Sequence, residues 1–160
     1  MVRIGQSYDI HQIKLKENSI ISLGGIKIPS EYEIIAHSDG DILLHVIIEA
    51  LIGAMGLGDI GDFFPDTDNK YKNIDSQILL KEVYQEIENN HYRINNIDAL
   101  VNLETPILKN YKMIIKKNIA QLLNLDENQV NIKATRGEGL GFVGEKKGIC
   151  AFCSVIIEND

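Results

Sequence analysis

Cysteine is scarce in this sequence, and the two cysteines present are not arranged as a metal or redox site. Cys150 and Cys153 stand three positions apart in one apolar segment, without the second pair or nearby histidines that would complete a zinc site. If that segment is a strand, the two side chains point to opposite faces. We therefore expect two buried free thiols and a reducing compartment.

Positive charge and long apolar runs are also in short supply. The chain has 16 Lys and Arg against 23 Asp and Glu, a formal net charge of −7. This balance argues against nucleic acid or an anionic membrane as a partner held by bulk charge. No segment reaches the roughly 18 apolar residues of a membrane span, and a strand pattern that begins at Val2 indicates no signal or transit segment. A phosphorylated ligand would have to be bound by metal ions, helix N-termini or backbone amides.

Length and composition indicate one ordinary globular domain over residues 1–160. The sequence is 44% hydrophobic and 24% charged, and it contains no repeat, linker or low-complexity segment. Apolar patterning predicts strands at 2–10, 20–23, 26–28, 94–103, 130–134 and 149–157. Helical spacing predicts helices at 39–54, from 76 onward, and at 106–124. Strands interleaved with helices predict an α/β (α+β) sandwich with a mixed β-sheet and helices packed on one face.

Several boundaries of these elements are predicted from single residues. Gly24 and Gly25 mark a hairpin turn, and Pro29 is expected to end that hairpin because proline cannot donate to a ladder. Ser38 or Asp39 is expected to cap the first long helix, and Ser76 the second, while Pro106 is expected to open the third. The stretch 56–73 is expected to be a functional loop.

Two polar clusters could hold a metal ion. Asp9 and His11 lie two apart on a predicted strand and so share a face, and Asp41, His45 and Glu49 are spaced by four on a predicted helix. Asp9, His11 and His45 would make a three-ligand set with a fourth position open, as catalytic zinc sites have. Spacing alone does not bring His45 next to His11, so ordinary surface or core histidines remain the alternative.

Two loops could contact a phosphorylated ligand. The acidic loop 58–68 is either a solvated loop or a set of acceptors for a polyol, and it lacks the alternation and terminal Glu of an EF-hand calcium loop. Gly139, Gly141 and Gly144 match a dinucleotide fingerprint but run into a strand, which excludes a Rossmann site. That loop is either a plain glycine-rich connection or one whose amides, Thr135 and Arg136 approach phosphates, with Glu138 as a ligand for a hard cation.

Short motifs follow one another in a recognisable order along the whole chain. They run from Arg3 to Gly5, Tyr8 to His11, Ala36 to His45, Gly58 to Gly61, Phe64 to Asp68, Asp75 to Ser76, Lys133 to Thr135 and Glu138 to Ile149. In this order they resemble the 2-C-methyl-D-erythritol 2,4-cyclodiphosphate synthase family of the non-mevalonate isoprenoid (MEP) pathway.

The resemblance implies a homotrimer with the sheets around the three-fold axis and active sites between neighbouring subunits. The implied enzyme is a phosphorus–oxygen lyase acting on the small molecule 4-diphosphocytidyl-2-C-methyl-D-erythritol 2-phosphate. Its 2-phosphate attacks the β-phosphate, which closes the cyclic diphosphate and expels CMP. The alternatives are a zinc-dependent phosphoesterase and a non-catalytic trimer that binds nucleotides. The implied compartment is the bacterial cytoplasm, or a plastid-type organelle (apicoplast or chloroplast) if a presequence was removed.

The resemblance also assigns roles to residues of this chain. Asp9, His11 and His45 would hold Zn²⁺, Glu138 would help to hold Mg²⁺ or Mn²⁺, and His37 would stabilise the transition state. The residues implied in substrate binding are Asp9, Ile10, His11, His37, Ser38, Asp59, Ile60, Gly61, Phe64, Pro65, Asp66, Thr67 and Asp68. The residues implied in cytidine binding are Leu103, Glu104, Thr105, Pro106, Ile107, Leu108, Lys109, Thr135, Arg136, Gly137 and Glu138.

The chain departs from the family pattern at four positions. Arg136 stands where a threonine credited with transition-state stabilisation is usual, and we hypothesise that its guanidinium either replaces that hydroxyl as a phosphate donor or turns to solvent. Ile107 replaces a lysine and Glu49 an aspartate. Phe142 and Glu145 would line a central trimer cavity proposed to bind isoprenoid diphosphates. An arginine is usual at position 145, so a carboxylate there would repel such a ligand.

Overall fold

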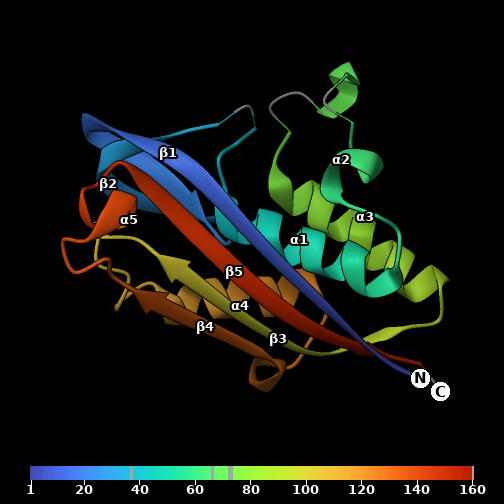
Figure 1. Ribbon diagram of the computed structural model, residues 1–160. Coiled ribbons are helices and arrows are strands. Elements are labelled where there is room, and N and C mark those ends of the chain that lie inside the picture. The colour runs from blue at the N-terminus through green and yellow to red at the C-terminus, as the bar shows by residue number, and fades with distance from the viewer. Residues whose placement is uncertain (37, 66, 72–73, 160) are drawn as a thin grey trace.

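The computed structural model describes residues 1–36, 38–65, 67–71 and 74–159 (Figure 1). Its strands are β1 (Val2–Leu23), β2 (Ile26–Ile35), β3 (Arg93–Asn102), β4 (Val130–Thr135) and β5 (Gly148–Glu158). They form a single five-stranded sheet in the order β2-β1-β5-β3-β4. All neighbours pair antiparallel except β3 and β4, which pair parallel. The predicted mixed sheet is thereby confirmed.

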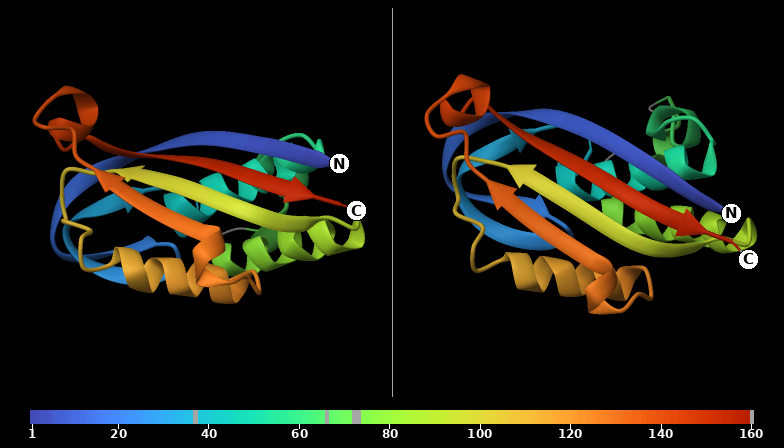
Figure 2. Two further views of the ribbon diagram at one scale, coloured as in Figure 1. Left: turned by 90° about the horizontal axis from the view of Figure 1, so that it is seen from below. Right: turned by 60° about the horizontal axis from the view of Figure 1, so that its bottom comes forward.

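The long helices cover one face of this sheet (Figure 2). They are α1 (Ile42–Met55), α3 (Ser76–Asn89) and α4 (Lys112–Leu122). Shorter turns of helix are α2 (Ile60–Phe63), η1 (Asn69–Tyr71), η2 (Glu127–Gln129) and α5 (Gly141–Gly144). None of the helices in the described ranges is long and apolar enough to cross a membrane.

Helix α1 is the centre of the core because it packs between the sheet and α3 (Figure 1). Eleven of its 14 residues are buried, and the residues that are not are His45, Glu49 and Gly53, spaced by four along one stripe. Gly5 on β1 lets this helix approach the sheet, since a Cβ at that position would lie 1.8 Å from the carbonyl oxygen of Ala50. The stripe that carries His45 is therefore fixed closely against β1.

Two boundary predictions that rest on prolines are wrong. Pro29 does not end the hairpin: β2 continues to Ile35, with Pro29 paired opposite Ile20. β2 is an edge strand, where a missing N–H costs no ladder bond. Pro106 does not open a helix either, since α4 begins only at Lys112.

Helix caps also differ from expectation by a few residues. Asp41, not Ser38 or Asp39, caps α1 and accepts a hydrogen bond from the Leu44 N–H at 3.0 Å. Asp75, not Ser76, caps α3. The expected loop 56–73 contains α2 and η1, and the expected glycine-rich loop contains α5. Both cysteines are buried and free, as predicted.

Candidate metal and nucleotide sites

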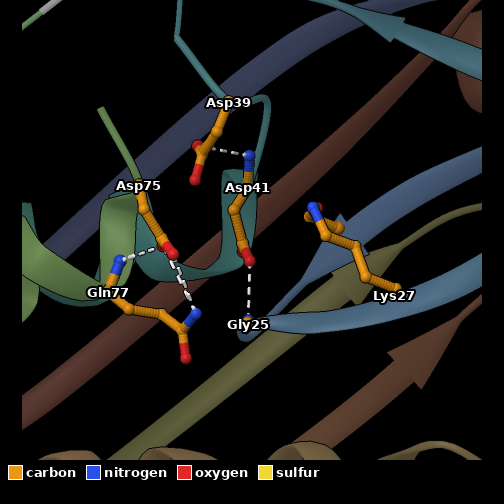
Figure 3. Close-up of a pocket in the computed structure, with 7 residues that line it drawn as sticks. Gly25, Lys27, Asp39, Asp41, Asp75 and Gln77 are labelled. Carbon is orange, nitrogen blue, oxygen red and sulfur yellow. Dashed lines mark hydrogen bonds between the residues drawn. The ribbon is translucent and has the colours of Figure 1, made fainter. Parts of the chain in front are cut away.

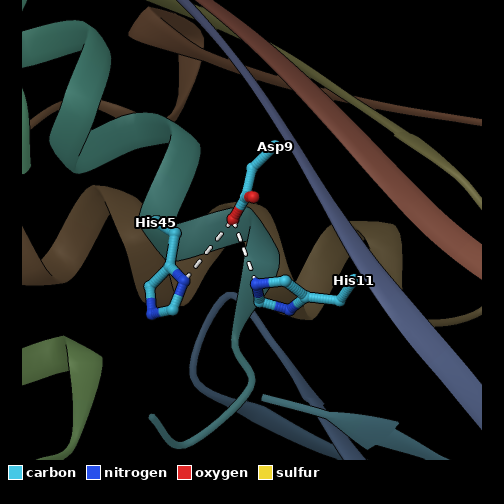
Figure 4. A group of neighbouring side chains, drawn as sticks. All are labelled: Asp9, His11 and His45. Atoms are coloured by element: carbon cyan, nitrogen blue, oxygen red, sulfur yellow. Dashed lines mark ion pairs between the residues drawn. The ribbon is translucent and has the colours of Figure 1, made fainter. Parts of the chain in front are cut away.

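Asp9, His11 and His45 converge in the structure (Figure 4). Oδ2 of Asp9 lies 3.2 Å from Nε2 of His11 and 3.6 Å from Nδ1 of His45. The two imidazole rings are 5.6 Å apart at an interplanar angle of 78°. One carboxylate oxygen and two ring nitrogens thus face a common point from β1 and α1, as the sequence hypothesis required.

Local structure explains how residues 34 positions apart come together. Asp9 and His11 share a face of β1 because side chains alternate along a strand. His45 lies in the first turn of α1, whose position against β1 is fixed by the contact at Gly5 and by a hydrogen bond from Ser7 Oγ to the Val46 carbonyl. The metal hypothesis therefore depends on helix–sheet packing that the sequence pattern alone does not specify.

Asp41 does not join the polar stripe predicted from its spacing. Its side chain is buried and accepts hydrogen bonds from the backbone N–H groups of Gly24, Gly25 and Leu44 at 2.8, 2.7 and 3.0 Å. It therefore ties the hairpin turn to the start of α1. The unpaired amides of a helix N-terminus attract a carboxylate, and this attraction overrides the helical spacing as a guide.

The electrostatics of the cluster favour an anionic Asp9. Burial opposes its ionisation, but the interactions with the neighbouring His11 and His45 imidazoles outweigh burial and hold its pKa well below the usual value. The pKa of neighbouring Glu49 is raised, first by burial and then by the negative charges of Asp9 and Asp59. An ionised carboxylate with two imidazoles is the donor set that Zn²⁺ prefers, and each ligand atom lies within 4.8 Å of the others. These residues fit a divalent metal ion.

Asp59, near the start of the acidic loop, is close enough to Glu49 for its negative charge to raise the pKa of that carboxyl. Asp59 caps α2 in a capping box with Asp62, so its carboxylate orders the loop. Of the other predicted substrate contacts, Ile60 is half-buried, Phe64 is buried, and Gly61, Pro65, Thr67 and Asp68 are exposed. Ile10 is exposed and Ser38 half-buried. His37 and Asp66 lie outside the described residues.

A pocket of about 150 Å³ lies between the ends of β3 and β4 and the segment that leads into α4. Its lining combines apolar side chains with basic ones. The lining residues are Leu103, Ile107, Leu108, Lys109, Lys112, Ala134, Thr135 and Arg136. Six of these belong to the predicted cytidine set. Lys112 and Ala134 were missed: Lys112 lies one helical turn beyond Leu108, and Ala134 precedes Thr135 in the Lys133–Thr135 motif.

Glu104 lies behind this pocket and holds the side chain of Arg136. Arg136 Nη2 donates to Oε1 of Glu104 at 2.7 Å, and the Gly137 N–H donates to Oε2 at 2.9 Å. Burial opposes ionisation of Glu104, but these two hydrogen bonds outweigh it and lower its pKa. Arg136 is therefore held by Glu104 in an ion pair, while about half of its side chain stays exposed to solvent. Thr105 and Pro106 are half-buried beside Glu104.

The remaining predicted residues lie on the connection between β4 and β5. Glu138 is exposed and has a left-handed backbone (φ 53°). It is not part of the cluster of Asp9, His11 and His45. Among the described residues, that cluster is the one group of His, Cys, Asp and Glu side chains that could hold a metal ion. Phe142 packs against Gly148. Glu145 accepts a hydrogen bond from Lys147 Nζ, so the charge expected to repel a diphosphate there is paired.

Similarity to known proteins agrees with this geometry over nearly the full chain. The YgbB family matches residues 2–158. The chain belongs to the YgbB family. A relative from Clostridium novyi (strain NT), named 2-C-methyl-D-erythritol 2,4-cyclodiphosphate synthase, is 54% identical over 148 residues, which are 92% of this chain and 93% of that protein. One of the same name from Listeria monocytogenes serotype 4b (strain CLIP80459) is 48% identical over 159 residues, 99% and 100% of the two chains.

A solved structure shares the fold. The chain superposes on "IspF (Plasmodium falciparum) CDP complex" with a TM-score of 0.87 and 39% identity, covering 99% of this chain and 97% of that one. The α+β architecture predicted from the sequence is thus that of its relatives.

Proposed function

We propose that this YgbB-family chain converts 4-diphosphocytidyl-2-C-methyl-D-erythritol 2-phosphate into 2-C-methyl-D-erythritol 2,4-cyclodiphosphate and CMP, as a phosphorus–oxygen lyase of the MEP pathway. The observation that carries the proposal is the convergence of Asp9, His11 and His45 on one point (Figure 4). Relatives at 48% and 54% identity bear the name of this enzyme.

The reaction needs positive charge and alignment more than it needs a nucleophile from the protein. An oxygen of the 2-phosphate forms a bond to the β-phosphorus, the bond from that phosphorus to the oxygen bridging to the α-phosphate breaks, and CMP leaves with that oxygen. No water is consumed. Because both reacting groups are anionic, groups that hold them in line and balance developing charge supply the catalysis.

Asp9, His11 and His45 would hold Zn²⁺ at the reacting end of the substrate. A divalent ion bound there supplies Lewis-acid charge to phosphate oxygens. Glu138 would help to hold Mg²⁺ or Mn²⁺. His37 and Ser38 would contact the phosphates, and the segments Asp59 to Gly61 and Phe64 to Asp68 would bind the methylerythritol hydroxyls.

The pocket lined in part by Arg136 would bind the nucleotide end of the substrate. Leu103, Leu108 and Ile107 offer an apolar surface to the cytosine, while Lys109 and Lys112 offer positive charge to the phosphates. Glu104 and Gly137 lie outside the pocket lining, and the hydrogen bond between them holds the loop that carries Thr135. A CDP complex is the subject of one structure with the same fold, which supports a cytidine nucleotide as the ligand.

Three copies of the chain would complete the site. The triad of Asp9, His11 and His45 and the nucleotide pocket lie on different elements. The triad lies on β1 and α1, whereas the pocket lies at β3, β4 and α4. The sheet face away from the helices exposes Ile4, Tyr8, Ile10 and Phe152, with the Tyr8 and Phe152 rings 4.8 Å apart. Such an apolar face is typical of a subunit interface. We propose that it packs on the three-fold axis and brings one subunit's triad to its neighbour's pocket.

Phosphorus NMR of the products tests the activity. The purified protein with Zn²⁺ and Mg²⁺ should convert the CDP substrate into a cyclic diphosphate and CMP in equal amounts. An open-chain monophosphate product would instead indicate a zinc phosphoesterase. Free thiols and bacterial relatives support a cytoplasmic enzyme, and the apicoplast remains the alternative given the Plasmodium structure.

A further inference from the structure

The ring nitrogen of His45 that faces away from Asp9 has its own set of partners. Nε2 of His45 lies 3.0 Å from Oγ of Ser76 and 3.8 Å from Oδ1 of Asp39. Ser76 is fully buried at the start of α3 and Asp39 is half-buried. Asp39 lies between the N-termini of α1 and α3 (Figure 3).

The hydrogen atoms in this group can be placed by counting donors. Ser76 has a single hydroxyl hydrogen, and Oγ of Ser76 lies 2.6 Å from Oδ1 of Asp39, a carboxylate that can only accept. That hydrogen therefore goes to Asp39. The contact between Ser76 Oγ and His45 at 3.0 Å then requires His45 Nε2 to be the donor. With its proton on Nε2, neutral His45 presents a bare lone pair on Nδ1, the nitrogen that faces Asp9 and His11.

We propose that Asp39 and Ser76 are positioning residues that act through His45: they fix its Nε2–H tautomer and ring orientation so that Nδ1 is ready to bind the metal ion. This inference rests on the metal role assigned to His45 in the proposed function. It adds residues that do not themselves touch the metal.

Asp39 is held firmly enough to orient its neighbours. Its Oδ1 also accepts the Asp41 N–H at 3.1 Å (Figure 3). Its Oδ2 accepts the Ser76 N–H at 2.8 Å. The carboxylate thus joins the first turns of α1 and α3 and cannot rotate without breaking both contacts. In contrast, Nδ1 of His11 is buried and has no hydrogen-bond partner among the described residues. His45 is therefore the ligand whose ring orientation is set by the hydrogen bonds of Asp39 and Ser76.

Ser38 is the competing acceptor. Its Oγ lies 3.3 Å from Nε2 of His45 and also accepts the Gly40 N–H at 3.3 Å. Ser76 is closer to His45 and is the one whose hydrogen is committed to a carboxylate. Ser76 should therefore matter more than Ser38 for metal affinity.

The first test measures the dissociation constant of Zn²⁺ by competition with a chromophoric chelator. Ser76→Ala and Asp39→Asn should each weaken Zn²⁺ binding roughly tenfold or more, as loss of a partner behind a metal ligand does. The double variant should be little worse than either single one, because both act through His45. Asp75→Ala is the matched control: it removes the cap of the same helix, where Asp75 accepts the Gln77 N–H, without touching His45.

Three outcomes overturn the proposal. The first is unchanged Zn²⁺ affinity in Ser76→Ala, and the second is an equal loss in Asp75→Ala, which would make the effect one of helix stability. The third is a large loss in Ser38→Ala with none in Ser76→Ala, which would transfer the role to Ser38.

The second test uses the wild-type protein, so its result does not depend on whether a variant folds. Two-dimensional ¹H–¹⁵N NMR of the histidine rings in the Zn²⁺-loaded wild-type protein should show His45 protonated on Nε2 with Nδ1 on the metal. A proton on Nδ1 overturns the proposal. If wild-type protein binds Zn²⁺ with this tautomer but forms no cyclic product, the proposed function fails while the positioning role stands. If it cyclises the substrate and Ser76→Ala binds Zn²⁺ normally, the reverse holds.

Discussion

Arg136 and Glu104 form an ion pair across the ends of β3 and β4, with Nη2 of Arg136 2.7 Å from Oε1 of Glu104. The other carboxylate oxygen holds the Gly137 N–H. Glu104 is almost fully buried whereas Arg136 is half-exposed, so the carboxylate is the fixed member of the pair. The pair therefore sets the conformation of the turn that follows Thr135, next to the proposed nucleotide pocket.

Removing this pair should weaken nucleotide binding more than turnover. Glu104→Gln keeps the side-chain shape but loses the charge that holds Arg136, so we expect KM for the CDP substrate to rise several-fold with a smaller change in kcat. Steady-state kinetics measure both.

Arg136→Thr is the matched variant, because threonine is the residue that the family resemblance implies at this position. If Arg136 acts only through Glu104, this variant should also change KM more than kcat. A large fall in kcat would assign the guanidinium a direct contact with the reacting phosphates, and unchanged kinetics would remove Arg136 from the site.

Metal removal should destabilise the protein through His45. A ligand that binds only the folded state stabilises it by about 2.7 kcal/mol at a free concentration 100 times its dissociation constant. Chelation should therefore lower the melting temperature of the wild type and abolish cyclisation, and Zn²⁺ should restore both. In His45→Ala we expect activity to fall about 100-fold or more. Chelation should leave the melting temperature of this variant unchanged.

His91→Asn is the control for that experiment, because it removes an exposed imidazole on the turn after α3. It should respond to chelator as the wild type does. A His45→Ala protein that still melts lower in chelator would show that the ion binds elsewhere.

The contact between β1 and α1 should couple stability to the metal site. At Gly5 a Cβ would lie 1.8 Å from the Ala50 carbonyl oxygen, so Gly5→Ala must push α1 away from β1 and separate Asp9 from His45. Both the free energy of unfolding and Zn²⁺ affinity should fall. Denaturant titration and metal competition measure the two effects.

Gly53→Ala is the opposite case on the same helix. A Cβ added at Gly53 would meet no atom within 4 Å among the described residues outside the helix's own backbone, and replacing a helix-interior glycine by alanine stabilises by roughly 0.5–1 kcal/mol. It should raise stability and leave Zn²⁺ affinity unchanged. A Gly5→Ala protein with normal Zn²⁺ affinity would contradict the role given to this packing.

Alkaline pH should destabilise the fold through Cys153. Burial, and then the charge of Asp98, raise the pKa of this thiol to about 12 from 9.0. A raised pKa means that the stabilising contribution is complete below pH 9 and is lost as pH rises toward 12, at up to about 1.4 kcal/mol per pH unit. Denaturation midpoints from pH 8 to 11 should fall less steeply in Cys153→Ala than in the wild type. Parallel slopes would contradict the shift.

The sequence predicted which residues share a face but not which faces meet. Period two placed Asp9 with His11, and helical spacing placed His45 with Glu49. Their convergence depends on the close approach at Gly5, a tertiary contact for which a single glycine in a strand is too weak a signal. The elements themselves were predictable because strands and α1 are strongly apolar and periodic.

Helix termini show where local chemistry overrode the pattern. The spacing of Asp41 indicated a stripe with His45, but three backbone N–H groups hold its carboxylate in the core. Ser76 was expected to cap α3; Asp75 does so, which leaves the Ser76 hydroxyl for Asp39 and His45. Choosing among adjacent polar residues needs the hydrogen-bond geometry that only the fold supplies.

The most direct test of the account is anomalous X-ray diffraction at the zinc edge from crystals grown with Zn²⁺ and CDP. The account predicts one strong peak within about 2.0–2.2 Å of an Asp9 oxygen, His11 Nε2 and His45 Nδ1. A zinc peak that His45 does not ligate, or no peak at this point in otherwise well-ordered crystals, would contradict it.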